Sequence, residues 1–542
     1  MKEGFRQSMA WFHTWVGLLA GWLLFFTFLT GTLGYVNYEI DRWMKPEKPL
    51  SLAPLSPKEL LPLALSRLTA QAAEAKFWRI SFPGGRMNDE LEIGWEASPE
   101  PGEEFGKFTR ETLDPVTGMP IEDDAVRKTG GGDLLYSMHY RLHYMPATTA
   151  YIIVGVCAMF MLMAIISGII IHKKIFKDLL TFRPGKGQRS WLDGHNVLSV
   201  TALPFHLMIT YSGLIYLMFT YMPFGPEIIY GADNRDLFFE EAFENTRSDS
   251  AKVMSMAKTA PLMPMLVKAE AHWGKGNIST ININNPGRAN AKVTFFPRHS
   301  EMITQDGLGF DGVSGQIVEG AGTKYATQTN EVLIGLHEGL FAGPVLRVLY
   351  VLSGLGGTAM IGTGLLLWST KRRAKLAKSG KSHFGVAIVD RLNLGTIVGL
   401  PIAIAAYFWA NRLIPASMEG RADWEAHAMF ITWAAMFVYP VWRPLDRAWA
   451  EMLVFAAGAY ALLPIVNFFT TDRHLGITIA HGDWVLAGFD LTVFAIGLVF
   501  ALLGVKSYRK IIVTMPVPLL DIEKGFAVFS THISNEKDIS DV

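Results

Sequence analysis

The sequence predicts an all-α polytopic membrane protein of about eight transmembrane helices, with two small α+β modules outside the membrane. Half of its 542 residues are hydrophobic, and its mean hydropathy is positive, which is unusual for a soluble globular protein. Apolar stretches alternate with polar segments, two of which are long enough to fold as small domains. The chain also contains an internal duplication.

Eight stretches could each cross the bilayer core, which takes roughly 20 residues in a helix. They are residues 10–36, 146–171, 196–221, 340–369, 386–410, 425–442, 449–469 and 483–505. The last four have no counterpart earlier in the chain and predict a separate four-helix extension. The first is too long for a cleaved signal peptide, so we expect a retained anchor.

Positive charge is distributed unevenly between the apolar stretches, and this predicts the orientation. Lys and Arg are concentrated in the loops 173–190 and 371–384 and near the N-terminus. Because cytoplasmic loops are enriched in these residues, we expect all three segments inside the cell. An even number of crossings then places both termini in the cytoplasm and the polar segments 37–142 and 222–336 outside.

The composition excludes several classes of function. Lys plus Arg equals Asp plus Glu at 49 each, so no basic surplus points to nucleic acid. Cys157 is the only cysteine, which excludes internal disulfides, a CxxCH haem attachment and a cysteine-ligated iron–sulfur cluster. The chain has no nucleotide-binding fingerprint. Any redox centre must therefore be held by other side chains.

One pair of histidines lies at equivalent positions of the duplication. His13 lies 17 residues before Thr30-Gly31, and His195 lies 17 residues before Ser212-Gly213. Both histidines are expected near the inner end of their helices. The equal offsets predict that the two histidines have the same role in each repeat.

A second pair, His143 and His337, is expected at the outer membrane end. Each follows a leucine, and each precedes a small-residue dipeptide, Ser167-Gly168 or Thr363-Gly364, with a two-residue length difference between the copies. His139 lies one turn before His143, so either could be the functional residue of the first repeat. The symmetry favours His143.

The outer segments repeat as well. The sequence DPVTG at 114–118 matches DGVSG at 311–315, and each predicts a hairpin turn. The stretches 77–85 and 280–288 match as strands that end in a Pro-Gly turn. The sequence thus predicts four parts: a first repeat at 1–174, a second repeat at 175–373, the extension at 374–510 and a cytoplasmic tail at 511–542.

Histidine is the informative residue type here, because an ionisable side chain in a membrane helix is a candidate functional residue by default. A neutral imidazole ligates haem iron, and without thiolates bis-histidine ligation is the natural arrangement. His143 and His172 are 29 residues apart, about 44 Å along a helix, so they cannot share one iron. The pattern predicts one site near each membrane surface, with His13 and His195 at the inner one.

Two further histidines are candidate ligands. His172 lies at the inner end of its helix, where it could either ligate or sit among headgroups. His206 lies 11 residues after His195, which on one continuous helix places both on the same face about 16 Å apart. Pro204 could bend that helix. His206 could therefore bind a more deeply set haem or hydrogen-bond across the bundle.

Together these patterns resemble a known family. The repeated histidine and Thr/Ser-Gly pattern, the DPVTG and DGVSG turns, and the stretch RSWLDGHNVLSVTALPFHLMITYSGL (189–214) are similar to those of the PepSY-associated transmembrane proteins. The resemblance covers roughly residues 8–373. It implies that the two outer segments are PepSY-like modules and that the chain lies in the bacterial inner membrane. It also implies two b-type haems, whose iron is held by His13, His143, His195 and His337.

The function that the resemblance implies is ferric-siderophore reduction. Electrons from quinol or another membrane donor would pass through the haems to a ferric siderophore outside the cell membrane, in the service of iron uptake. Two alternatives stay open: a non-catalytic PepSY binding or regulatory protein, and a permease for the siderophore. This chain departs from the family pattern in having His172, His206 and the four-helix extension.

Overall fold

The structure is a computed structural model of the whole chain. It describes residues 4–48, 55–84, 90–97, 107–114, 116–121, 126–172, 181–231, 237–238, 255–298, 307–318, 325–379 and 383–514. The expected tail at 511–542 lies almost wholly outside these residues, as do parts of the two loops expected in the cytoplasm.

The first repeat runs from a long membrane helix through an outer module to a second membrane helix. Its elements are α1 (Phe5–Gly34), α2 (Asn37–Met44), α3 (Pro57–Gln71), β1 (Phe77–Ser81), β2 (Leu91–Glu96), β3 (Phe108–Leu113), α4 (Gly131–Arg141) and α5 (Ala147–Ile171). The helix α3 begins with a capping box, in which Ser56 and Glu59 each satisfy the other's backbone N–H.

The second repeat follows the same order. Its elements are α6 (Gln188–Thr201), α7 (Leu203–Tyr216), α8 (Met218–Tyr221), α9 (Phe224–Tyr230), α11 (Leu262–Trp273), β4 (Ile278–Asn284), β5 (Lys292–Pro297), β6 (Leu308–Asp311), α12 (Tyr325–Glu338) and α13 (Pro344–Ser379). The helices α6 and α7 together correspond to α1, while α4 corresponds to α12 and α5 to α13.

The two outer modules share one antiparallel sheet of six strands, in the order β3-β2-β1-β4-β5-β6. The central pair is β1 with β4, and it joins the repeats about a two-fold axis: Arg79 pairs with Asn282, its own counterpart in the duplication, and Ile80 pairs with Ile281. Residues such as Ile80, Ile281 and Leu266 form one buried core between the strands and the helices α3 and α11. The expected separate modules are thus a single folded unit.

The matching turns after β3 and β6 have the same chemistry. The carboxylate of Asp114 accepts hydrogen bonds from the backbone N–H groups of Val116 and Thr117, both at 2.8 Å. The carboxylate of Asp311 accepts from Val313 and Ser314 in the same way. Gly118 and Gly315 follow with φ of +69° and +68°, where an L side chain would be strained.

The membrane helices are fewer by strict criteria than the sequence predicted. Among the described residues six helices are long and apolar enough to span, or seven if the bent pair α6 and α7 is one span. These two meet at an angle of 69° next to Pro204, where a bend was expected. The stretch 425–442 falls in α16, whose first turn is charged, so an eighth crossing stays a prediction.

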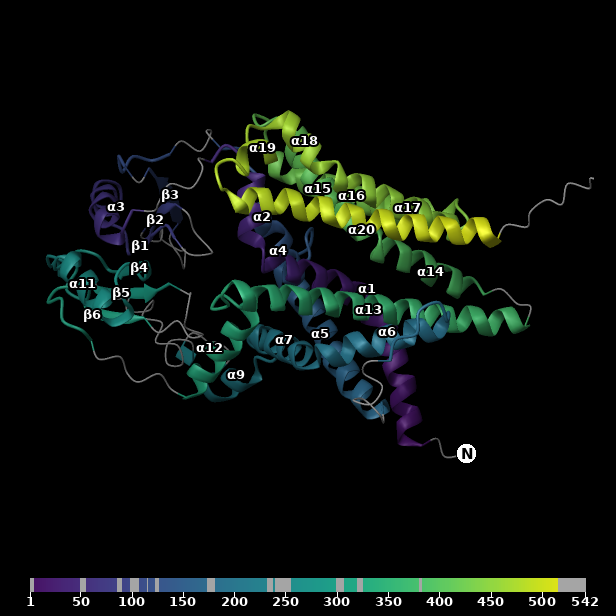
Figure 1. Ribbon diagram of the computed structural model, residues 1–542. Helices are drawn as coiled ribbons and strands as arrows, with labels where there is room; N and C mark the ends of the chain where they lie inside the picture. The colour runs from purple at the N-terminus through teal and green to yellow at the C-terminus, as the bar shows by residue number, and fades with distance from the viewer. Residues whose placement is uncertain are drawn as a thin grey trace, which may run out of the picture.

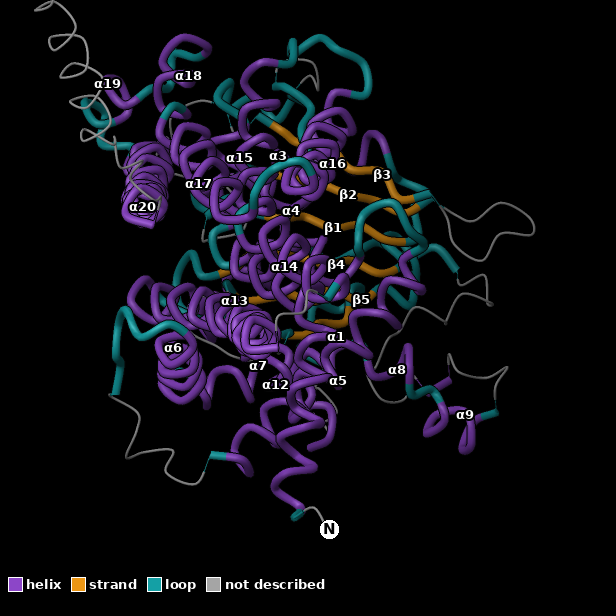
Figure 2. The backbone as a smooth tube through the Cα atoms, turned by 90° about the vertical axis from the view of Figure 1, so that its right-hand side faces the viewer, coloured by secondary structure: helices purple, strands orange, loops and turns teal. Residues whose placement is uncertain are grey.

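The extension forms a second helical group beside the repeats (Figure 1). Its elements are α14 (Phe384–Ile397), α15 (Gly399–Leu413), α16 (Arg421–Val438), a 3₁₀ turn (Tyr439–Val441), α17 (Leu445–Ala461), α18 (Leu463–Thr470), α19 (Leu475–Thr478) and α20 (Trp484–Thr514). Figures 1 and 2 together show the sheet covering one end of the helical bundle, opposite the N-terminus.

Candidate functional site: two facing histidine pairs

Two histidines from different repeats face each other at the end of the bundle away from the sheet. The ring centres of His13 on α1 and His195 on α6 are 6.2 Å apart, with the ring planes at 76°. Nδ1 of His13 donates to the carbonyl oxygen of Ala164 at 2.9 Å, and Nδ1 of His195 donates to that of Met360 at 2.9 Å. Because a carbonyl only accepts, Nδ1 carries the hydrogen and Nε2 keeps its lone pair.

A second pair lies at the sheet end of the bundle. The ring centres of His139 on α4 and His337 on α12 are 6.4 Å apart, with the ring planes at only 21°. Nδ1 of His139 bonds to the carbonyl oxygen of Tyr136. Nδ1 of His337 lies 3.0 Å from Oγ of Ser212, whose own hydrogen is donated to Met208. Both histidines therefore also present Nε2 as the free nitrogen.

Each of the four rings packs against a glycine of the duplicated Thr/Ser-Gly dipeptides. A methyl group in place of the glycine hydrogen would lie 3.0 to 3.5 Å from an atom of the facing ring. The pairs are Gly168 with His13, Gly364 with His195, Gly31 with His139 and Gly213 with His337. The glycines thus leave room for imidazole rings between the helices, which explains why both motifs recur together.

His143, which the symmetry favoured, is in neither pair. The helix α4 ends at Arg141, and Leu142 has a φ of +48°, so the chain turns away before His143. The ring of His143 instead stacks on Phe430 of the extension, with ring centres 5.5 Å apart. His139, one turn earlier, is the residue whose ring lies beside that of His337, so the structure favours the alternative that the symmetry did not.

The other two candidates are also outside the pairs. His172 ends α5, and its Nδ1 is buried with no partner among the described residues. His206 is buried beside Phe28, with Nε2 3.3 Å from the carbonyl oxygen of Ser353. The bend between α6 and α7 removes the shared face that a continuous helix would give His206 and His195. No ring contact joins either residue to another histidine in the described part of the chain.

The geometry of both pairs fits one metal ion between two imidazoles. An imidazole nitrogen binds a transition metal at about 2.0 Å, and the ring centre lies about 1.1 Å behind it, so two such ligands have ring centres about 6.2 Å apart. The observed separations are 6.2 and 6.4 Å. No group of three or more possible metal ligands occurs among the described residues. The two imidazoles of each pair are therefore the ligands that such a site would have.

Unpartnered polar atoms lie between the two pairs. Thr27 Oγ1, His206 Nδ1 and Thr210 Oγ1 are buried without a hydrogen bond among the described residues. Thr27 precedes Gly31 by one turn, and Thr210 precedes Gly213 by three residues, so both lie on the side of the outer pair. The distance between the pairs along α1, from His13 to Gly31, is about 27 Å.

Burial keeps the histidines at the sheet end neutral, and two tyrosines bond to the helix that carries His337. Burial lowers the pKa of His139 to about 4, and burial together with the neighbouring His139 lowers the pKa of His337 to about 3. The hydroxyl of Tyr35 donates to the carbonyl oxygen of His337, and that of Tyr350 donates to Leu336, both at 3.0 Å. These tyrosines cap the end of α12.

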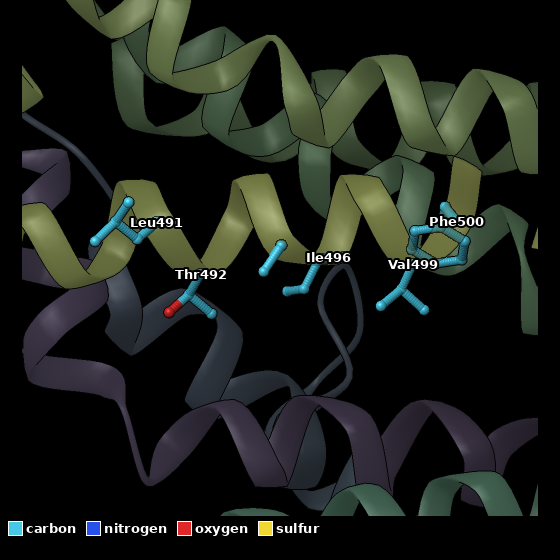
Figure 3. Close-up of a pocket in the computed structure, with 6 residues that line it drawn as sticks. Leu491, Thr492, Ile496, Val499 and Phe500 are labelled. Carbon is cyan, nitrogen blue, oxygen red and sulfur yellow. The ribbon is translucent and has the colours of Figure 1, made fainter. Parts of the chain in front are cut away.

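A groove on α20 is apolar and lies apart from the histidines. It encloses about 490 Å³ and is lined by Leu491, Thr492, Ala495, Ile496, Val499 and Phe500. Figure 3 shows these side chains on one face of α20, with the hydroxyl of Thr492 as the one polar group. Such a face suits lipid chains and offers no chemistry for catalysis.

The family model of the PepSY-associated TM region matches residues 10–371. The chain belongs to this family. All four paired histidines and their glycines lie within the match, whereas the extension lies beyond it. A Pseudomonas aeruginosa protein that is described only as uncharacterized is 24% identical over 385 residues, which are 67% of this chain and 92% of that protein.

Proposed function

We propose that this PepSY-associated protein holds two b-type haems and carries electrons across the bacterial inner membrane to a ferric chelate outside, such as a ferric siderophore. The observation that supports the proposal is the pair of facing histidines at each end of one bundle, at the ring separation that a shared metal requires. His13 and His195 are the inner ligands, and His139 and His337 are the outer ligands.

The chain contributes neutral imidazole ligands and the space between the helices that holds their rings. Each ring uses Nδ1 for a hydrogen bond, which fixes the tautomer and leaves Nε2 with its lone pair for a metal. The glycines of the duplicated dipeptides let the helices approach the rings. Bound there, haem supplies a one-electron carrier near each membrane surface. Quinol or another membrane donor provides the electrons.

The orientation follows from charge and from the place of the sheet. The basic residues 371–378 at the end of α13 and the described residues 181–190 lie toward the inner pair, and the shared sheet lies beyond the outer pair (Figure 1). With the basic loops in the cytoplasm, the sheet faces the periplasm. The outer pair is then the exit for electrons, and the sheet end of the bundle is the side where the chelate binds.

Visible spectra of the purified protein with and without dithionite test the haem. Two low-spin haems per chain are expected. His139→Ala should lose one haem, while His143→Ala, a matched control one turn away, should keep both. Reduction of an external ferric chelate by proteoliposomes that contain quinol tests the activity. A haem-free protein after expression with adequate haem supply would overturn the proposal and favour a binding, regulatory or permease role.

A further inference from the structure

The short helix α4 carries His139, and the extension holds this helix at both ends. The extension lies outside the family match. Hydrogen bonds and a ring stack join the extension to both ends of α4.

At the start of α4, buried side chains of α15 and α16 form hydrogen bonds with Gly131 and Thr129. The hydroxyl of Tyr407 donates to the carbonyl oxygen of Gly131 at 2.9 Å. Thr129 donates to the carboxylate of Glu425 at 2.5 Å and accepts from the N–H of Gly131 at 3.1 Å. Glu425 also forms an ion pair with Arg421 in which both side chains are 0% exposed. A buried pair of this kind is rigid, because separating the charges is costly.

At the end of α4 a strained turn is held against α16. Leu142 and Tyr144 have φ of +48° and +69°, which are unfavourable for residues other than glycine. The hydroxyl of Tyr144 donates to Nδ1 of His427 at 2.5 Å. The ring of His143 stacks on Phe430 with the planes 9° apart. Such strain persists only where surrounding contacts determine it, and two of these contacts come from the extension.

The ring of His139 follows the helix that carries it. Its Nδ1 bonds to the carbonyl oxygen of Tyr136, one turn back on α4, so the ring cannot rotate independently of the helix. The angle between the ring planes of His139 and His337 is 21°, against 76° for the inner pair. A tilt of α4 would change the outer angle directly and leave the inner one unchanged.

We propose that the four-helix extension is the positioning element of the outer histidine pair: by fixing both ends of α4 through Tyr407, Glu425 and His427, it sets the nearly parallel arrangement of the His139 and His337 rings. This inference rests on the proposed function, because it concerns how the outer haem is ligated. His143 then helps to hold the end of α4, because its ring stacks on Phe430 of the extension.

Electron paramagnetic resonance reads the ring angle directly. In a low-spin ferric haem with two imidazoles, nearly parallel rings give a rhombic spectrum, whereas nearly perpendicular rings give a strongly anisotropic spectrum with a larger principal g value. The wild-type protein should show both signals, the rhombic one from the outer site and the anisotropic one from the inner site. The inner signal is thus an internal control in every variant.

The test compares Tyr407→Phe and His427→Phe with Tyr460→Phe. Tyr460 is also buried in the extension and donates to Pro401 at 2.8 Å, but no hydrogen bond or ring contact among the described residues joins it to α4. The first two variants should shift the principal g values and the midpoint potential of the outer haem and leave the inner signal unchanged. Tyr460→Phe should change neither signal, even if it lowers stability.

Several outcomes would overturn the inference. If Tyr407→Phe and His427→Phe both leave the outer signal at its wild-type position, the extension does not set the angle. The same holds if the inner signal shifts equally, since the effect would then be general loosening. Should either variant fail to fold, Tyr144→Phe removes the His427 contact at an exposed residue and must shift the outer signal. Absence of both signals would instead refute the proposed function itself.

Discussion

The glycines that face the histidines allow a graded prediction. A methyl group added at Gly213 would lie 3.0 Å from Cε1 of His337, whereas one added at Gly31 would lie 3.5 Å from Cγ of His139. Ordinary contact begins at 3.4 Å, so Gly213→Ala must displace the ring by a few tenths of an ångström and Gly31→Ala need not. Overpacking of this kind typically costs 1–3 kcal/mol, against a gain of about 1 kcal/mol from alanine in a helix.

The two variants should therefore differ in their effect on the haem site. Gly213→Ala should weaken haem binding at the outer site by about 1–2 kcal/mol, which is a factor of about 5–30 in affinity. Gly31→Ala should keep both haems and unfold at the same or a slightly higher temperature. The assay is the haem-to-protein ratio by pyridine haemochrome, with thermal unfolding in the same detergent. Equal behaviour of the two variants would refute the assignment of Gly213 and His337 to one tight site.

Three further outcomes are expected. Ser212→Ala removes the acceptor of the His337 Nδ1 hydrogen, so the ligand becomes less basic, and the midpoint potential of the outer haem should rise; an unchanged potential in redox titration would contradict this role. Val313→Cys in a Cys157→Ala background should be labelled by an impermeant maleimide in intact spheroplasts, and labelling only after lysis would reverse the topology. Arg421→Met leaves a buried carboxylate unpaired and should destabilise the protein by about 3–5 kcal/mol, which thermal unfolding of the purified protein measures.

Much of the site could be predicted from the sequence because the duplication marks it. The equal spacing from His13 and His195 to their small-residue dipeptides identified a pair that the structure brings within 6.2 Å. The dipeptides themselves contact the rings. The contact is made by the neighbouring helix, however, and only the three-dimensional arrangement shows that the motif of one helix serves the histidine of another.

The choice between His139 and His143 could not be made from the sequence. Gly364 lies 27 residues after His337, while Gly168 lies 25 residues after His143 and 29 after His139, so both alternatives differ from the other repeat by two residues. The decision depends on where α4 ends. It ends through a positive φ at Leu142, a residue that carries no helix-stop signal, and the next residue, His143, contacts the distant helix α16.

The bend at α6 and the pairing of the two modules are also tertiary effects. Pro204 indicated a bend, but not its size of 69°, which separates the faces of His195 and His206. The strands β1 and β4 were each predictable as strands. Their pairing across the repeats is non-local, and no turn sequence joins them.

The pairing of β1 with β4 has a consequence for the origin of the molecule. The pair is centred on Arg79 and Asn282, which are counterparts, so the contact is the kind that a symmetric dimer makes with itself. Each histidine pair likewise takes one ring from each repeat. A chain with a single repeat would thus have half of every site. The two repeats of this chain are thus related to each other as the two subunits of a two-fold dimer are, with β1 paired to its counterpart β4.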